Sequence, residues 1–187
     1  MGLVLGISIS LGLYFWDGVL EDKQDILRAV DVHTVYMIPY IQKQLDVYFC
    51  GAFRNIRSHI LHLSDKNMCK CISISASFAN DGKTTCVSNI ASSLAFAGYK
   101  TVVVDLDFKE SKIESEFELS SGGHPGVSNY FDSAVGSAKL PIKCNHENLF
   151  MVTTGSGEHK RTKYLSPKKI FTLIEELKKE FDFVLLN

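Results

Sequence analysis

The segment that most constrains the fold is Ser77–Thr85 (SFANDGKTT), which separates an apolar strand-like run from a helix-like run. The run before it, Lys70–Ala76, alternates like a buried strand, and Thr85–Ala97 carries apolar residues at helical spacing. A strand that enters a helix through a short loop gathers unpaired backbone N–H groups and the positive end of the helix dipole at one point. The pattern therefore predicts an anion-binding site.

The loop itself fits most of the pattern G-x-x-x-x-G-K-[ST], in which backbone N–H groups cradle phosphate oxygens, the Lys reaches the terminal phosphates and the hydroxyl ligates Mg²⁺. Gly82, Lys83 and Thr84 match, whereas Ser77 stands where the first Gly usually is. We therefore predict a nucleotide site with Mg²⁺; the alternative is an ordinary strand-to-helix turn. The predicted nucleotide-binding residues are Ser77, Ala79, Asn80, Asp81, Gly82, Lys83, Thr84 and Thr85.

Two carboxylates follow the next predicted strand, in the sequence Asp105-Leu106-Asp107-Phe108-Lys109. Acidic residues at the carboxyl end of a parallel strand lie where such sheets bind ligands. We predict that Lys83 stabilises the transferring phosphate, that Asp105 holds Mg²⁺ together with Thr84, and that Asp107 is the base that accepts a proton. The alternative is that both aspartates only cap the following turn.

Strands and helices alternate along the rest of the chain, a pattern that predicts a parallel sheet with right-handed crossovers. The expected strands are 70–76, 101–106, 149–153 and 183–186, and the expected helices are 52–63, 85–97, 127–132 and 166–179. The fold class is therefore α/β: a P-loop NTPase-like parallel sheet flanked by helices. Because the sequence stops at the end of a strand, we expect this sheet to be incomplete.

The N-terminal stretch Gly2–Trp16 (GLVLGISISLGLYFW) contains no charged residue. As a helix it would span roughly 22 Å, which is short of the ~30 Å hydrocarbon core of a bilayer. We interpret it as the end of a transmembrane helix; a buried or interfacial helix is the alternative. The expected domains are 1–16, the membrane segment; 17–50, a juxtamembrane linker; and 51–187, an ATP-binding domain.

Composition excludes some classes of function. The net charge of −1 gives no electrostatic footprint for nucleic acid. The five cysteines form no paired framework, which suits a reducing cytosol better than a secreted disulfide scaffold. A chain of 187 residues with 45% hydrophobic residues can bury one core plus an appendage.

Taken together, these motifs resemble the bacterial tyrosine kinases (BY-kinases) that are fused to chain-length-determinant, or polysaccharide co-polymerase, membrane domains. The resemblance rests on the loop, the Asp-Leu-Asp strand end, Ala52–Arg57 (AFRNIR) and the upstream apolar segment, and it continues through 126–131 and 149–155. It implies an ATP-dependent protein-tyrosine autokinase in capsular or exopolysaccharide biosynthesis and export. It also implies a homo-oligomer at the bacterial inner membrane, with the ATP-binding domain facing the cytoplasm and the polysaccharide export machinery as partner.

The chain departs from that family's pattern at three positions. Lys109 replaces an Arg of the second acidic motif, and Asn187 stands where the Walker B carboxylate is expected. The subunit-contact motif keeps Arg54 and Arg57 but has Gly51 in place of Glu, which should weaken the oligomer. The C-terminal tyrosine cluster that such kinases modify is also missing from this sequence.

Two other functions are compatible with the motifs. One is a degenerate or truncated copy that serves as an ATP-binding or membrane-assembly module, which Gly51 and Asn187 favour. The other is a partition or septum-site ATPase of related fold. Those proteins usually carry a Lys just after the loop's first position, where this chain has Phe78.

Overall fold

The computed structural model describes residues 36, 38, 47–63, 70–78, 80–109, 111–119, 123–132, 136–155 and 166–187. The chain divides into two units, Met1–Ala52 and Phe53–Asn187. The sheet, its flanking helices and the candidate site all belong to the second unit. The predicted division at residues 16 and 50 stays a prediction.

The second unit is built on a five-stranded sheet in the order β1-β5-β2-β4-β3. The strands are β1 Lys70–Ser73, β2 Thr101–Val104, β3 Ile142–Lys143, β4 Leu149–Val152 and β5 Phe183–Leu186. The four longer strands pair in parallel, which confirms the predicted parallel sheet. Strand β3 pairs antiparallel with β4 and was not predicted, because two residues are too few to show a periodicity.

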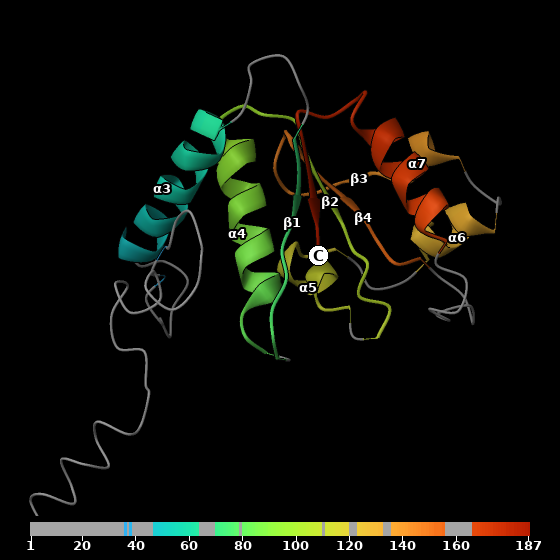
Figure 1. Cartoon of the computed structure of the whole chain (residues 1–187), viewed down its shortest axis with the longest axis horizontal. Helices are drawn as coiled ribbons and strands as arrows, with labels where there is room; N and C mark the ends of the chain where they lie inside the picture. Colours follow the sequence, from blue (N-terminus) through green and yellow to red (C-terminus); the bar gives the residue numbers. More distant parts are fainter. Residues whose placement is uncertain are drawn as a thin grey trace, which may run out of the picture. The chain divides into compact units, whose positions relative to one another are not determined.

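Helices cover both faces of this sheet, as Figure 1 shows, with α4 on one side and α6 and α7 on the other. The helices are α3 Val47–Leu63, α4 Lys83–Phe96, α5 Ile113–Glu116, α6 Val127–Phe131 and α7 Pro167–Leu177, with a 3₁₀ turn η1 at Ser137–Lys139. Helix α4 begins two residues before the predicted start at Thr85, so that Lys83 and Thr84 form its first turn. The α/β class predicted from the sequence is confirmed.

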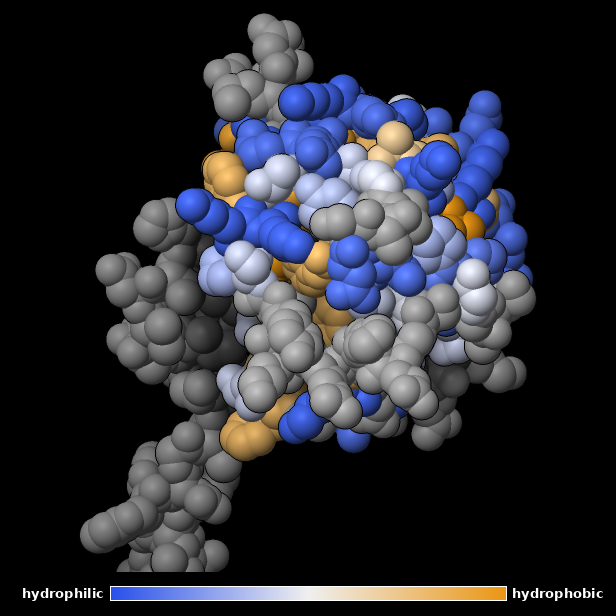
Figure 2. Space-filling view, turned by 90° about the vertical axis from the view of Figure 1, so that its right-hand side faces the viewer, coloured by the Kyte–Doolittle hydropathy of each residue, from blue (hydrophilic) through white to orange (hydrophobic). Residues whose placement is uncertain are grey.

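The core lies on either side of β2, whose four residues are all buried. Val102 and Val104 pack in a cluster with residues of α6 and α7, including Phe131 and Leu173. A strand covered on both faces reads as a continuous apolar run instead of an alternating one. On the outer side of α7, hydrophilic residues predominate among those described, with smaller hydrophobic areas between them (Figure 2).

The strand order brings distant segments of the chain to one edge of the sheet. Strand β5 lies between β1 and β2, and Leu186 is level with Ser73 on one side and with Val104 on the other. The residues that follow these strands are the loop before α4, Asn187, and Asp105. Because the strands are parallel, their carboxyl ends meet, and this edge is where open α/β sheets bind ligands.

A close approach of two glycine-containing segments fixes α6 against the end of β4. The backbone N–H of Val127 donates to the carbonyl of Thr153 at 2.9 Å, and that of Ser128 donates to Thr154 at 3.0 Å. A Cβ at Gly126 would lie 2.2 Å from the backbone nitrogen of Gly155. Only glycine therefore fits at position 126.

The predicted membrane segment, residues 1–16, lies outside the described residues and stays a prediction. Within the described parts of the chain, no helix has both the length and the apolar character needed to cross a membrane.

This close approach gives a test of the fold. Gly126→Ala should lower the free energy of unfolding by about 3 kcal/mol, because the new Cβ meets backbone atoms that cannot turn aside. Gly136→Ala is the matched control, since a Cβ there meets nothing within 4 Å. Its effect should stay within about 0.5 kcal/mol. Equal stability of the two variants in urea denaturation would contradict the packing described.

Candidate nucleotide site

The N-terminus of α4 presents free backbone donors at the carboxyl edge of the sheet. Gly82 precedes the helix with φ 78° and ψ 15°, a left-handed conformation that glycine adopts without strain. The Cys86 N–H donates to the carbonyl of Gly82 at 2.8 Å and is the first to join the helical ladder. The N–H groups of residues 83–85 precede that ladder, and the N-cap, Gly82, has no side chain to cap them. Together with the helix dipole they form an anion site.

The loop before the helix is held by its own side chains. The Asp81 carboxylate accepts the Phe78 N–H at 3.0 Å, so it is directed back into the loop. Asn80 has φ 68°, a left-handed conformation that Asn tolerates better than most residues. Phe78 is 77% exposed. Ala79, a predicted binding residue, lies outside the described residues.

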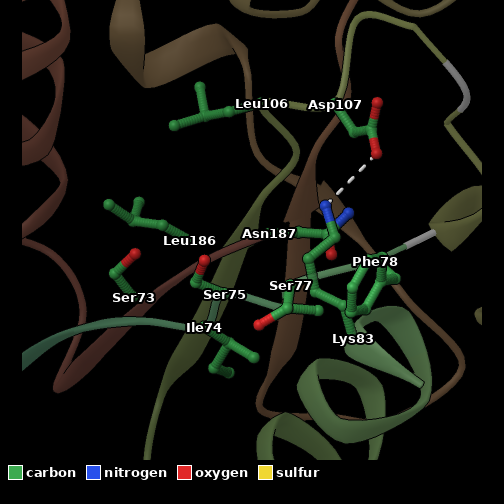
Figure 3. Close-up of a pocket in the computed structure, with 11 residues that line it drawn as sticks. Ser73, Ile74, Ser75, Ser77, Phe78, Lys83, Leu106, Asp107, Leu186 and Asn187 are labelled. Carbon is green, nitrogen blue, oxygen red and sulfur yellow. Dashed lines mark hydrogen bonds and ion pairs between the residues drawn. The ribbon is translucent and has the colours of Figure 1, made fainter. Parts of the chain in front are cut away.

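Lys83 and Asp107 meet across the site. Lys83 Nζ lies 3.2 Å from Asp107 Oδ2, and the two side chains are 26% and 30% exposed (Figure 3). The contact joins the start of α4 to the turn after β2. A partly exposed ion pair contributes at most about 1 kcal/mol. An incoming phosphate can therefore take Lys83 from Asp107 at small cost.

Asp105 is completely buried, and both of its carboxylate oxygens accept hydrogen bonds. Its Oδ1 accepts the Asp107 N–H at 3.0 Å and the Asn187 side-chain amide at 2.8 Å. Its Oδ2 accepts the Ser111 hydroxyl at 2.5 Å. These bonds hold the turn that carries Asp107.

Of the two predicted Mg²⁺ ligands, Thr84 is partly exposed and Asp105 is buried. Mg²⁺ keeps several waters and takes few protein ligands beside substrate phosphates. The partly exposed Thr84 lies in the same hollow as Lys83 and Asp107, where a phosphate would be bound. Asp105 has no exposed surface, and both of its oxygens already accept hydrogen bonds. Its predicted role as a metal ligand stays untested, and its present contacts favour a role in holding the turn.

Two adjoining hollows follow the loop. The larger, about 480 Å³, is lined by the ends of β1, β2 and β5 together with Lys83, and Figure 3 shows its lining residues. The smaller, about 240 Å³, lies over the start of α4 and is lined by Gly82–Thr85 among others. Phe78, Lys83 and Asp107 border both. The Lys83–Asp107 pair thus borders both the smaller hollow over the start of α4 and the larger one.

Two further residues of the site were not predicted. The Ser111 hydroxyl donates a hydrogen bond to Asp105. Lys112 lines the smaller hollow, and its Nζ lies 3.5 Å from Asn80 Oδ1. Neither belongs to a motif. Only the turn after β2, which brings them back towards α4, places them in the site.

The arginines expected at a subunit contact lie on α3. Arg57 Nη1 donates to the carbonyl and the hydroxyl of Ser93 on α4, at 2.9 and 3.2 Å. This arginine therefore joins the part of α3 that belongs to the second unit to α4. Gly51, at the position where the family has Glu, has no side chain to pair with it or with Arg54.

Cys86, on the helix that follows the loop, and Cys144, at the amino end of β4, are not activated thiols. Burial raises the pKa of the Cys86 thiol on α4 and raises that of Cys144 to about 12. A thiol with a raised pKa is protonated at neutral pH, and the thiolate is the nucleophilic form. The chemistry of the site therefore rests on Lys83, the hydroxyls and the carboxylates.

Curated relatives carry kinase names. The chain is 34% identical over 118 residues to "Tyrosine-protein kinase CpsD" of Streptococcus pneumoniae, a match that covers 63% of this chain and 52% of the relative. It is 28% identical over 135 residues to "Putative tyrosine-protein kinase CapB" of Staphylococcus aureus, covering 72% of this chain and 58% of that protein. The chain thus spans about half the length of the curated relatives it matches. No protein-family model matches it.

Solved structures share the fold. The chimerical protein CapA2B2 superposes with a TM-score of 0.74 at 22% identity, over 88% of this chain and 74% of that one. The BceF tyrosine kinase domain superposes with a TM-score of 0.75 at 17% identity, over 90% of this chain and 76% of that domain. The septum site-determining protein MinD of Pyrococcus horikoshii, complexed with Mg-ADP, superposes with a TM-score of 0.56 at 22% identity. This match covers 64% of this chain and 48% of MinD. The curated names support the BY-kinase resemblance of the sequence motifs, and the solved structures share the fold.

The strained position in the loop gives a test of the site's geometry. Asn80→Ala should lower the free energy of unfolding by about 1 kcal/mol, because alanine disfavours the left-handed conformation at φ 68°. Asn80→Gly removes the same side chain without that strain and should be at least as stable as the native chain. If urea denaturation found the glycine variant less stable than the alanine variant, the loop conformation would be wrong.

Proposed function

We propose that this chain is the ATP-binding part of a bacterial protein-tyrosine autokinase that acts in capsular or exopolysaccharide biosynthesis and export. The observation that carries the proposal is the uncapped N-terminus of α4 beside the Lys83–Asp107 pair. The first feature suits a nucleotide's phosphates, and the second supplies a cation for the transferring group and a carboxylate for the attacking hydroxyl. The names of the curated relatives give independent support.

In this proposal the N–H groups at the start of α4 and the Lys83 ammonium bind the terminal phosphates of ATP. Thr84 would hold Mg²⁺, which would supply further charge neutralisation there. Asp107 accepts the proton of the tyrosine hydroxyl. The tyrosine oxygen bonds to the γ-phosphorus as the bond between that phosphorus and the ADP oxygen breaks. Asp107 can take this role because Lys83 leaves it for the phosphate.

The surroundings of the chain are part of the same proposal. We place it at the inner membrane with the ATP-binding part facing the cytoplasm, as a homo-oligomer that works with the polysaccharide export machinery. A relative from Klebsiella pneumoniae, 25% identical over 138 residues, is named "Putative tyrosine-protein kinase in cps region". The absence of a carboxylate at Gly51 would weaken the contact between subunits.

A nucleotide-binding module without phosphoryl transfer is the second candidate. The amide at Asn187 and the complete burial of Asp105 favour it, because neither group offers a free carboxylate to a metal. A septum-site type of ATPase has less support. MinD covers less of this chain than the kinase domains do, and the loop carries an exposed Phe78 where such ATPases have Lys.

The test is phosphotyrosine formation by the purified chain with MgATP, alone and with an added tyrosine-containing peptide. Lys83→Met should abolish the signal, and Asp107→Asn should lower it by about 100-fold, within the range for loss of a general base. Lys179→Met is the control for loss of a lysine, because Lys179 is exposed and lies just after the C-terminal end of α7.

Each result has a separate meaning. Phosphotyrosine that persists in Lys83→Met would contradict the kinase proposal. Saturable ATP binding without phosphotyrosine in the native chain would favour the nucleotide-binding module.

A further inference from the structure

The main chain of Asn187 is fixed between its neighbours at the carboxyl edge of the sheet. Its N–H donates to the Val104 carbonyl at 3.0 Å, and its own carbonyl accepts the Leu106 N–H at 3.1 Å. Residue 187 therefore continues the pairing of β5 with β2 for one step past the strands. These two backbone hydrogen bonds to the sheet fix the position from which its side chain extends.

From this position the side-chain amide donates to Asp105 Oδ1 at 2.8 Å. Both residues are buried: Asp105 has no exposed surface and Asn187 is 8% exposed. The orientation of the amide follows from its partner. The opposite orientation would set the amide oxygen against a carboxylate oxygen, leaving two acceptors in contact with no proton between them.

We propose that Asn187 is a positioning residue that replaces a metal-dependent contact with a direct hydrogen bond. With Asn187, the buried carboxylate of Asp105 is held by three donors from the chain itself. A carboxylate at position 187 could not donate. Two carboxylates at the 2.8 Å separation of this contact would instead have to share a proton or hold a cation between or beside them. The acidic edge of this site is therefore assembled without Mg²⁺.

This inference concerns the site of the proposed function and rests on it for its biological meaning. Asp105 in turn accepts the N–H of Asp107, so the amide of Asn187 acts on the candidate base through one carboxylate. The other atom of the amide, Oδ1, is buried and has no hydrogen-bond donor among the described residues.

The test is thermal unfolding of the whole chain without nucleotide, in EDTA and in millimolar Mg²⁺. The native chain should have the same melting temperature in both. Asn187→Asp should melt about 10 °C lower in EDTA, because it places two carboxylates together, and should recover most of that loss in Mg²⁺. Asn187→Leu removes the donor without adding charge, so it should be destabilised and should not respond to Mg²⁺.

A second variant covers the case in which Asn187→Asp does not fold. The double exchange Asp105→Asn with Asn187→Asp keeps one amide and one carboxylate across the contact. It should fold, melt closer to the native chain than Asp105→Asn alone does, and show no response to Mg²⁺.

The proposal is overturned if Asn187→Asp is as stable in EDTA as the native chain, if the native chain itself needs Mg²⁺, or if the double exchange is no better than Asp105→Asn. None of these readouts involves ATP or phosphotyrosine. A failure of the kinase proposal would therefore leave this test intact, and the reverse also holds.

Discussion

The parallel pairing of β5 between β1 and β2 is the constraint on which the rest of the structure depends. Because Leu186 is level with both Ser73 and Val104, the residues that follow the three strands meet at one edge of the sheet. The loop before α4, the turn after β2 and Asn187 are brought together there. The Lys83–Asp107 ion pair and the Asp105–Asn187 hydrogen bond both span this edge. Without the central β5, neither contact could form.

Much of the architecture could be predicted from local sequence patterns. The apolar run Thr101–Val104 and the run Phe183–Leu186 read as buried strands because both of their faces are covered by helices. The Ser166-Pro167 pair marks the start of α7, since Pro is suited to the first turn of a helix. Gly82 and Lys83 marked the loop, and the structure makes Gly82 the N-cap and Lys83 the first residue of α4, two residues before the predicted start.

The remaining features depend on contacts between residues far apart in the chain. No local pattern could show that Asn187 donates to Asp105, 82 positions away, or that Ser111 completes the same network. The sequence marked Asn187 as a departure from the family pattern; the fold shows what the amide does there. Asp105, predicted as a metal ligand, lies in a network of internal donors, while Asp107 carries the exposed carboxylate of the pair. The sequence assigned both aspartates to the site, and the structure distinguishes them by burial: Asp105 is fully buried and the Asp107 side chain is 30% exposed.

The central claim is that the start of α4 binds the phosphates of a nucleotide. Its most direct test is the change in backbone amide NMR resonances of the ¹⁵N-labelled chain on titration with ADP and Mg²⁺. The account predicts saturable shifts that are largest for Gly82, Lys83, Thr84 and Thr85, with a second group at Asp107 as Lys83 leaves it. Shifts confined to other parts of the sheet, or no shifts in a chain shown to be folded, would contradict it.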